Sequence, residues 1–416
     1  MTALIRAALR QSVLALACGR VEATAVGEPV STARASDADA ALPRCDALAD
    51  VPLVPTQVPM GIISAAPSSF AALREAGFTM VGPWYRPAPD RALLDAAADA
   101  GLGVVFPVGY PHDRYLAEHT IAWDAARIEA ELTAQIAAVA DHRAIVAWYL
   151  EPEELRYWRP EELAYLRRAV ATIHAADPRA RPVLGYQPNA RDAQQLAPVL
   201  AHFDIGSKGA YVGFAGHRDR RAWMRWSVAQ LREATPTGRP VWVLTEMFED
   251  PPAGSDVDIA AWVRHDVFAS LLAGADGVLV YSGWRRPGFG AYDAYLAAYR
   301  DVAHALNHQG LAAVLRGGRR CRSAAARVVD GPDAVALSIA GRAERWPSLQ
   351  QVELRAGDEH WIWLVNSAAA PIVVEHDALP PGPLAYGHEH AARTDAGLWL
   401  GPHAVVALRE RVGAGL

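Results

Sequence analysis

Two glutamates stand directly after apolar, β-rich runs of the sequence. Glu151 lies in the segment Trp148-Tyr149-Leu150-Glu151-Pro152, and Glu246 ends the segment Val243-Leu244-Thr245-Glu246. A facing pair of carboxyl groups can cleave a glycosidic bond, because one protonates the leaving oxygen while the other attacks the anomeric carbon or activates a water. A separation of about 5–5.5 Å is typical of retention and about 6.5–9.5 Å of inversion. This chemistry requires elements that bring Glu151 and Glu246 to one place.

Short β-rich runs alternate with longer amphipathic segments rich in Ala, Leu and Arg from Pro59 onward, which is typical of βα units around a parallel sheet. The eight runs are 60–64, 79–84, 103–108, 144–150, 182–186, 203–207, 240–245 and 277–281. The helices expected between them include 68–75, 90–100, 123–140, 160–176 and 258–273. Eight nearly continuous apolar runs favour a closed (β/α)8 TIM barrel, whose strands are buried on both faces.

In such a barrel the functional side chains lie at the C-terminal ends of the strands. Glu151 and Glu246 follow the fourth and seventh runs, so both are expected at this mouth. Candidate substrate-binding residues follow other runs: Trp84, Tyr85, Tyr110, His112, Tyr186, Gln187, Asn189, Lys208, Tyr211 and Trp284. Their aromatic rings could stack on sugars, although core packing is the alternative for each of them. Lys208 would lower the pKa of a neighbouring carboxyl group.

The Glu before Pro at the end of strand four, together with the Glu at the end of strand seven, resembles the retaining (β/α)8-barrel glycosidases of clan A. The resemblance covers roughly residues 59–307 in organisation and only a few residues in motif. It implies that Glu151 is the general acid/base, that Glu246 is the nucleophile, and that Trp284 floors a sugar subsite. The chain departs from the clan at Leu150, where the clan usually has an Asn that binds the sugar 2-hydroxyl.

Two other hypotheses stay open. The missing Asn before Glu151 favours a non-catalytic barrel that binds carbohydrate in a polysaccharide export or assembly system. An inverting hydrolase would instead pair Glu246 with Glu153, Glu154 or Asp204. Glu153 and Glu154 are also explained as the acidic first turn of a helix, where carboxylates interact favourably with the helix dipole.

The pattern changes after about residue 310. Short alternating runs at 334–339, 360–365, 371–374 and 404–408 are separated by turn residues. We therefore expect a barrel domain over 59–310 and a small antiparallel β-sandwich over 311–416. No GxGxxG, Walker, HExxH or GxSxG sequence occurs, so neither a cofactor nor a metal is expected.

The N-terminal residues resemble an export signal, because Arg6 and Arg10 precede an apolar run too short to span a bilayer. We expect residues 1–30 to be a signal peptide and residues 31–58 to be a flexible leader. The predicted protein is exported to the periplasm or the extracellular space. Cys18 loosely matches a lipoprotein cleavage box, which leaves a lipid anchor open.

The cysteines and the net charge limit the bonds and the classes of partner that we expect. In an exported protein Cys45 and Cys321 either pair or stay as two buried thiols, and the sequence leaves both readings open. The net charge is −6 and the Lys and Arg residues are spread along the chain, so nothing indicates a nucleic acid partner or an acidic membrane surface. The expected partner is a carbohydrate substrate.

Overall fold

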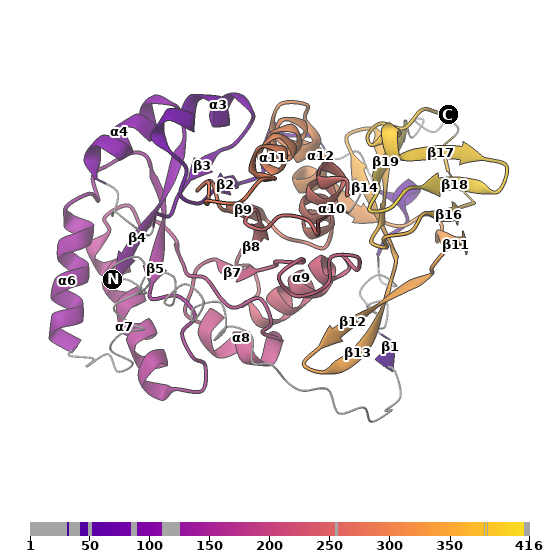
Figure 1. The fold of residues 1–416 in the computed structure, drawn as a ribbon. Coiled ribbons are helices and arrows are strands. Elements are labelled where there is room, and N and C mark those ends of the chain that lie inside the picture. The colour runs from indigo at the N-terminus through magenta and orange to yellow at the C-terminus, as the bar shows by residue number, and fades with distance from the viewer. Residues whose placement is uncertain are drawn as a thin grey trace.

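The protein is described here from a computed structural model that covers residues 31–32, 42–48, 52–84, 90–109, 125–253, 257–377, 379–380 and 382–411. A barrel surrounded by helices lies beside a region made of β-strands (Figure 1). None of the helices in these residues has the length and apolar character that a bilayer span requires.

The barrel has eight parallel strands and is nearly closed. They are β2 (Met60–Ile62), β3 (Met80–Val81), β4 (Gly103–Gly109), β5 (Ile145–Glu151), β6 (Val183–Leu184), β7 (Gly206–Gly209), β8 (Val241–Glu246) and β9 (Gly277–Tyr281). Their order in the sheet is β6-β5-β4-β3-β2-β9-β8-β7. Because β2 pairs with both β3 and β9, the first strand of the barrel meets the last. The predicted (β/α)8 barrel is confirmed.

Helices follow the strands and cover the outside of the barrel (Figure 1). They are η2 (Pro67–Ser69), α3 (Phe70–Glu75), α4 (Arg91–Asp99), α6 (Ala125–Ala137), α7 (Pro160–Ala176), α8 (Ala193–Leu200), α9 (Trp223–Ala234), α10 (Ile259–Leu272), α11 (Tyr292–Asn307) and α12 (Leu311–Gly317). The carboxylates of Asp90, Asp192 and Asp258 cap α4, α8 and α10 by accepting a backbone N–H three residues later. Gly77 and Gly101 follow α3 and α4 with positive φ, which suits glycine and lets the chain turn into the next strand.

Side chains of the barrel strands alternate between an inner and an outer core. The inner-core side chains of β5 and β8 are Ala147, Tyr149, Trp242 and Leu244. Their neighbours Trp148, Leu150 and Val243 pack in the outer core beneath the helices. Because the period of a strand is two residues, Glu151 and Glu246 continue the inner rows at the C-terminal end of the barrel, called the mouth below.

The second part is an all-β region. Its strands are β10 (Arg319–Cys321), β11 (Arg327–Asp330), β12 (Ala334–Ile339), β13 (Arg342–Pro347), β14 (Leu349–Ala356), β15 (Glu359–Asn366), β16 (Ile372–Glu375), β17 (Ala391–Thr394), β18 (Gly397–Leu400) and β19 (Val405–Arg411). Two antiparallel four-stranded sheets have the orders β10-β14-β15-β19 and β11-β16-β18-β17, and the 3-10 helix η3 (His388–His390) precedes β17. An all-β region after the barrel is confirmed.

A segment of the predicted leader is bonded to the all-β region. Cys45, in the 3-10 helix η1 (Cys45–Ala47), forms a disulfide with Cys321 of β10 across 276 residues of sequence. Arg44 forms a parallel bridge with Arg322, and β1 (Ser31–Thr32) pairs with β13. Residues 42–48 are therefore not the flexible leader that their composition predicted, because tertiary contacts outside the segment hold them.

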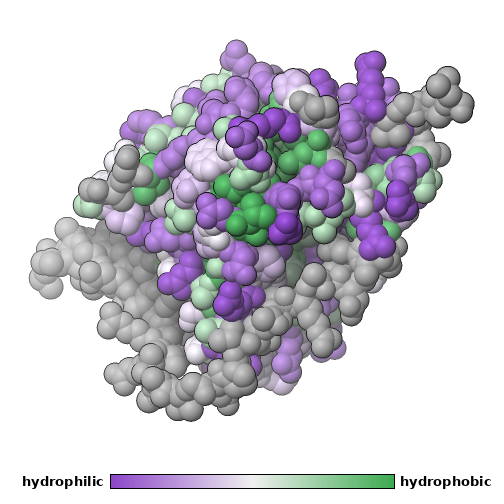
Figure 2. All heavy atoms as spheres, turned by 90° about the vertical axis from the view of Figure 1, so that its right-hand side faces the viewer, coloured by the Kyte–Doolittle hydropathy of each residue, from purple (hydrophilic) through white to green (hydrophobic). Residues whose placement is uncertain are grey.

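Helix α10 joins the two parts. The ring of Phe268 stacks on Trp363 of β15 with centroids 5.4 Å apart, and it lies 4.9 Å from the ring of Tyr386. Seen from the side of the all-β region, the surface is mostly hydrophilic and hydrophobic residues gather in smaller groups (Figure 2). The apolar side chains of α10 between Ala261 and Leu272 are buried.

Candidate functional site

The two predicted carboxylates lie at the mouth, and tyrosines from the outer helices fix the ends of their strands. Glu151 and Glu246 are each 7% exposed. The hydroxyl of Tyr165 on α7 donates to the backbone carbonyl of Glu151 at 2.7 Å. In the same way, Tyr299 on α11 donates to the carbonyl of Glu246 at 2.9 Å. Both strand ends are therefore held from outside the barrel while the carboxyl groups continue the inner rows.

Backbone amides hold the carboxyl group of Glu246. The Gly213 N–H donates to Oε1 at 2.7 Å and to Oε2 at 2.9 Å, and the Phe214 N–H donates to Oε2 at 3.2 Å. A guanidinium nitrogen of Arg221 lies 3.8 Å from Oε1. Burial raises the pKa of Glu246 to about 7, against the opposing effect of Arg221 and these amides. The group therefore changes its charge near neutral pH.

Arg221 is shared between Glu246 and a second buried acid. It forms two hydrogen bonds to Asp266 of α10, one from Nε at 2.8 Å and a shorter one from Nη2. Burial acts to raise the pKa of Asp266, but Arg221 and His265 hold it below its ordinary value. Asp266 thus neutralises much of the Arg221 charge, and less of that charge acts on Glu246.

This network continues into the all-β region. His265 lies 3.0 Å from Asp266 through Nδ1 and 2.9 Å from the Ser367 hydroxyl through Nε2. The Arg221 N–H donates to the carbonyl of Ser367 at 3.1 Å. Residues after β15 therefore help to position the guanidinium beside Glu246.

The pKa of Glu246 predicts a dependence of stability on pH. The folded chain keeps this proton up to about pH 7, whereas the ordinary value is 4.5. The stabilisation from proton binding is complete below about pH 4.5 and is lost as pH rises through 7, and the gap corresponds to about 3 kcal/mol. We expect the free energy of unfolding of the wild type, minus that of Glu246→Gln, to fall by about this amount between pH 4.5 and pH 8. Urea unfolding of both proteins measures it, and a difference that does not vary with pH would contradict the assignment.

A third carboxyl group, that of Glu153, contacts the inner core of the barrel. The hydroxyl of Tyr149, an inner-core residue of β5, donates a short hydrogen bond to Glu153. Burial raises the pKa of Tyr186, and the nearby charges of Glu154 and Glu153 add to that effect. Helix α7 begins only at Pro160, so the explanation of Glu153 and Glu154 as a first helical turn is wrong. The chain after β5 instead carries these carboxyl groups toward the tyrosines of the barrel interior.

Asp204 does not belong to the site. It precedes β7, at the opposite end of the barrel from the mouth. Its carboxylate lies 2.7 Å from Nε2 of His174 and accepts the N–H of Val183 at 2.8 Å. The suggested pairing of Asp204 with Glu246 is therefore excluded.

Aromatic rings line the inside of the mouth. Tyr186 stacks on Tyr211 with centroids 6.1 Å apart, and Tyr211 lies 5.2 Å from Phe248 and 5.8 Å from Tyr281. The Arg286 guanidinium lies over the rings of Tyr281 and Phe248, at 5.1 and 5.2 Å. Tyr186 and Tyr211 were predicted as binding residues, and they lie together here. Phe248, Tyr281 and Arg286 were not predicted. Tyr281 could have been found from its spacing of two residues from the inner-core Leu279.

Two predicted binding residues lie in the outer layer of the barrel. Strand β7 runs to Gly209, so Lys208 lies within the strand and points outward, where its ammonium reaches Ser227 at 3.2 Å and lies over Trp226 at 4.3 Å. Burial holds the pKa of Lys208 well below its usual range. The prediction that Lys208 lowers the pKa of a catalytic carboxyl group is wrong, because its side chain points away from the mouth. Trp84 packs in the outer core, and its indole N–H donates to the carbonyl of Ala65.

Two predicted amides support the mouth instead of facing it. Asn189 donates to the carbonyl of Tyr211 at 2.9 Å and accepts its N–H at 3.0 Å, which fixes the Tyr211 backbone. Gln187 accepts a hydrogen bond from Arg191 at 2.6 Å and is 1% exposed.

Trp284 follows β9 and is 48% exposed, with the guanidinium of Arg286 lying 5.4 Å from its ring centroid. Tyr85, Tyr110 and His112 lie outside the described residues.

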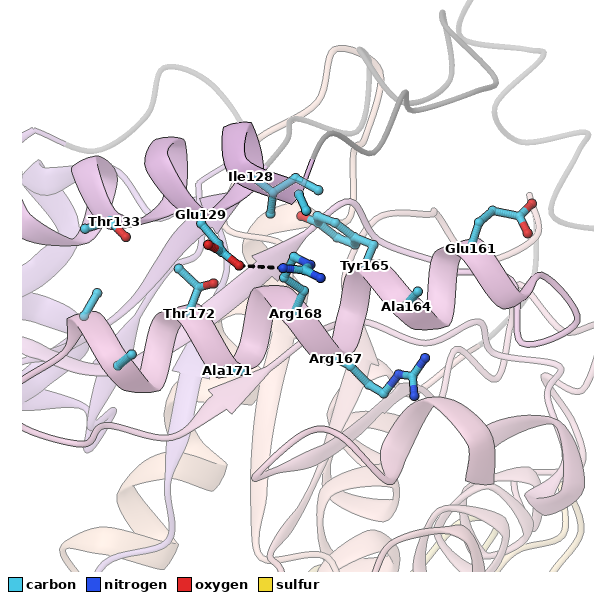
Figure 3. A pocket seen from close by; sticks show the side chains of 13 residues that line it. Ile128, Glu129, Thr133, Glu161, Ala164, Tyr165, Arg167, Arg168, Ala171 and Thr172 are labelled. Carbon is cyan, nitrogen blue, oxygen red and sulfur yellow. Dashed lines mark hydrogen bonds and ion pairs between the residues drawn. The ribbon is translucent and has the colours of Figure 1, made fainter.

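A hollow of about 880 Å³ lies on the flank of the barrel, between α6 and α7 (Figure 3). The ion pair between Glu129 and Arg168 joins the two helices across it at 2.6 Å. Alanine and other helix-surface side chains make up most of its wall, and none of the mouth carboxylates lines it. This hollow is therefore separate from the candidate catalytic residues at the mouth.

Solved structures of glycoside hydrolases share this fold. One described as a glycoside hydrolase is 14% identical, with 86% of this chain and 89% of that chain covered at a TM-score of 0.50. An α-amylase from Anoxybacillus is 10% identical, with 84% and 90% covered, also at 0.50. A β-D-glucuronidase from Dictyoglomus thermophilum matches at 13% identity and a TM-score of 0.43, and this chain spans only 43% of that enzyme. The predicted likeness to barrel glycoside hydrolases is confirmed at the level of the fold.

No family model matches the chain, and no curated protein matches it.

Proposed function

We propose that the protein is a glycoside hydrolase whose carboxyl pair is Glu151 and Glu246. The observation that carries this proposal is their position: both end barrel strands, both continue inner rows at the mouth, and both are nearly buried. The shared fold with glycoside hydrolases supports the same reaction class.

In the proposed mechanism Glu246 is the nucleophile and Glu151 is the general acid/base. The amides of Gly213 and Phe214 and the charge of Arg221 favour the ionised form of Glu246, which attacks the anomeric carbon. Glu151 donates a proton to the leaving oxygen, and a glycosyl ester forms on Glu246. Glu151 then removes a proton from water, which cleaves the ester, so the configuration is retained.

An inverting hydrolase is the second candidate, and the position of Glu153 favours it. Its hydrogen bond from Tyr149 brings a third carboxyl group beside the aromatic rings of the mouth. In this case a carboxylate would activate water for direct displacement, with no covalent intermediate. The anomeric configuration of the first product, followed by proton NMR, separates the two mechanisms.

The aromatic lining supports a carbohydrate substrate. Tyr211, Tyr281 and Phe248 pack against one another at the mouth, and beside them Trp284 presents an aromatic ring that is 48% exposed. Such a ring suits stacking on the C–H surface of a pyranose ring. We propose an oligosaccharide or polysaccharide of the periplasm or the extracellular space. The proposal of export rests on the composition of residues 1–30. These residues, which include the candidate anchor Cys18, lie outside the described residues.

To test this proposal, the purified protein is incubated with a panel of aryl glycosides and of plant and bacterial polysaccharides, and hydrolysis is measured. Released aryl alcohol and new reducing ends are measured beside a Glu151→Gln/Glu246→Gln double variant prepared identically, which removes contaminating activity from the comparison. Release by the wild type alone supports the proposal. Binding of a polysaccharide without any release would favour the non-catalytic carbohydrate-binding barrel.

Gly213 offers a prediction about the positioning of Glu246. A Cβ at residue 213 would lie 2.9 Å from Oε1 of Glu246 and 3.2 Å from Nε of Arg218, so the carboxylate would have to move. We expect Gly213→Ala to lower kcat/KM by about 10- to 100-fold, since small displacements at a reacting centre cost about that much. Gly290→Ala is the matched control, because its added Cβ meets nothing closer than 3.7 Å. Equal activity in both variants would contradict this role of the residue 213 backbone.

A further inference from the structure

A buried group of metal-binding side chains lies in the all-β region. Cys45, Cys321 and His360 each offer a ligand atom, and these atoms lie within 4.8 Å of one another. Glu353 of β14 adds a carboxylate, whose Oε2 is 3.3 Å from the Cys45 sulfur and 2.9 Å from Nε2 of His360. All four residues are at most 4% exposed. Two sulfurs, an imidazole nitrogen and a carboxylate oxygen form a donor set that suits zinc.

The side chains around this group are arranged as the surroundings of a metal site would be. Nδ1 of His360 lies 3.1 Å from Oε1 of Glu410, and a zinc-ligating histidine almost always donates its other ring N–H to such a group. Glu353 accepts the N–H of Ser323 at 2.8 Å and a hydrogen bond from Gln351 at 2.6 Å. The orientations of both His360 and Glu353 are therefore fixed by neighbours other than the cysteines.

Two of the distances between the proposed ligand atoms are close to those of a tetrahedral zinc site. Zinc bonds of about 2.0–2.3 Å place neighbouring ligand atoms about 3.3–3.8 Å apart. The Cys45 sulfur and the Glu353 oxygen already have this separation, at 3.3 Å. The His360–Glu353 contact of 2.9 Å must open slightly. The two sulfurs must separate as well, which the Cys45–Cys321 disulfide prevents.

We propose that Cys45, Cys321, His360 and Glu353 bind one zinc ion when the disulfide is reduced. A dithiol reductant supplies two electrons and two protons to the S–S bond, giving two protein thiols, and is itself oxidised to a disulfide. Zinc then replaces the two thiol protons and the proton that Nε2 of His360 shares with Glu353, and all three pass to solvent. His360 binds through Nε2 and keeps its Nδ1 proton toward Glu410. The ion would hold η1 on the all-β region in the reduced protein, as the disulfide does in the oxidised protein.

The site can be tested with zinc alone and does not depend on the proposed hydrolase activity. The full chain is prepared in oxidised and dithiol-reduced forms, the reductant is removed without oxygen, and each form is equilibrated with zinc chloride and desalted. We expect one zinc per reduced chain by mass spectrometry of the metal and none per oxidised chain. Cobalt(II) should give the thiolate-to-metal charge-transfer absorption in the reduced form only.

Matched variants separate this site from unspecific binding. Cys18→Ser, which removes the third cysteine, should keep the full zinc content. His360→Gln keeps the disulfide, so its folding is checked in the oxidised form before reduction, and it should bind zinc at least about 10-fold more weakly. Glu410→Gln should weaken binding by about 10- to 100-fold.

Three results would overturn the proposal. The first is a reduced wild type that binds no zinc. The second is a Cys45→Ser/Cys321→Ser variant that binds zinc as well as the reduced wild type. The third is a reduced chain that stays unfolded by circular dichroism when zinc is added, because binding at this site should stabilise the fold.

Discussion

Glu246→Gln is expected to lower kcat by about four orders of magnitude or more while the fold stays intact. The substitution keeps the size of the side chain but removes the oxygen nucleophile on which the glycosyl ester would form. A Gln carbonyl oxygen in the place of Oε2 can still accept the N–H groups of Gly213 and Phe214, so the loss reports on chemistry more than on the shape of the mouth.

The measurement is kcat on an aryl glycoside that the wild type hydrolyses, with thermal melting as the folding check. Glu249→Gln is the matched control, because Glu249 pairs with Arg218 at 2.9 Å and lies three residues farther along. It should change kcat by no more than a few-fold. Added azide should restore turnover of Glu246→Ala and give a glycosyl azide of inverted configuration, since azide then attacks directly. An active Glu246→Gln enzyme would remove Glu246 from the mechanism.

Glu151→Gln is expected to lower kcat by about two to four orders of magnitude, in a way that depends on the leaving group. Glycosides with poor leaving groups need the proton from Glu151 and should be hydrolysed most slowly. Dinitrophenyl glycosides leave without that proton, so their first step should be nearly preserved while the glycosyl ester on Glu246 accumulates.

This pattern is tested by pre-steady-state release of dinitrophenol and by adding azide. A burst followed by slow turnover, with azide giving a product of retained configuration, is the expected result. Glu129→Gln, which changes only the exposed ion pair with Arg168 on the flank of the barrel, is the control and should behave as the wild type. Equal losses for good and poor leaving groups would contradict a proton-donor role, and Glu153 would become the next residue to test.

The barrel could be predicted from the sequence because parallel strands buried on both faces form long apolar runs. The run predicted at 277–281 coincides with β9, and the one at 334–339 coincides with β12. Strand β13 was not predicted, because its residues are largely exposed and charged and show no alternation. The run predicted at 203–207 ends two residues before the end of β7 at Gly209. Because of this error Lys208 was predicted at the mouth, although it lies in the barrel wall.

The site could be predicted only in part. Glu151 and Glu246 could be proposed from the sequence because a carboxyl group directly after an apolar strand is unusual. Arg221 and Asp266 were not found, because they come from a loop and a helix and no local spacing connects them to Glu246. The zinc ligands proposed above share this difficulty, since residues 45 and 321 meet only in the folded chain.

The junction at α10 has a consequence for how such proteins can diverge. A module attached by a linker can be exchanged between barrels without altering their chemistry. Here Ser367 contacts both His265 and Arg221, and Arg221 lies beside Glu246, so a different module would change the charge around the candidate nucleophile. The barrel and the all-β region are therefore expected to be inherited as one unit, with recombination between them selected against.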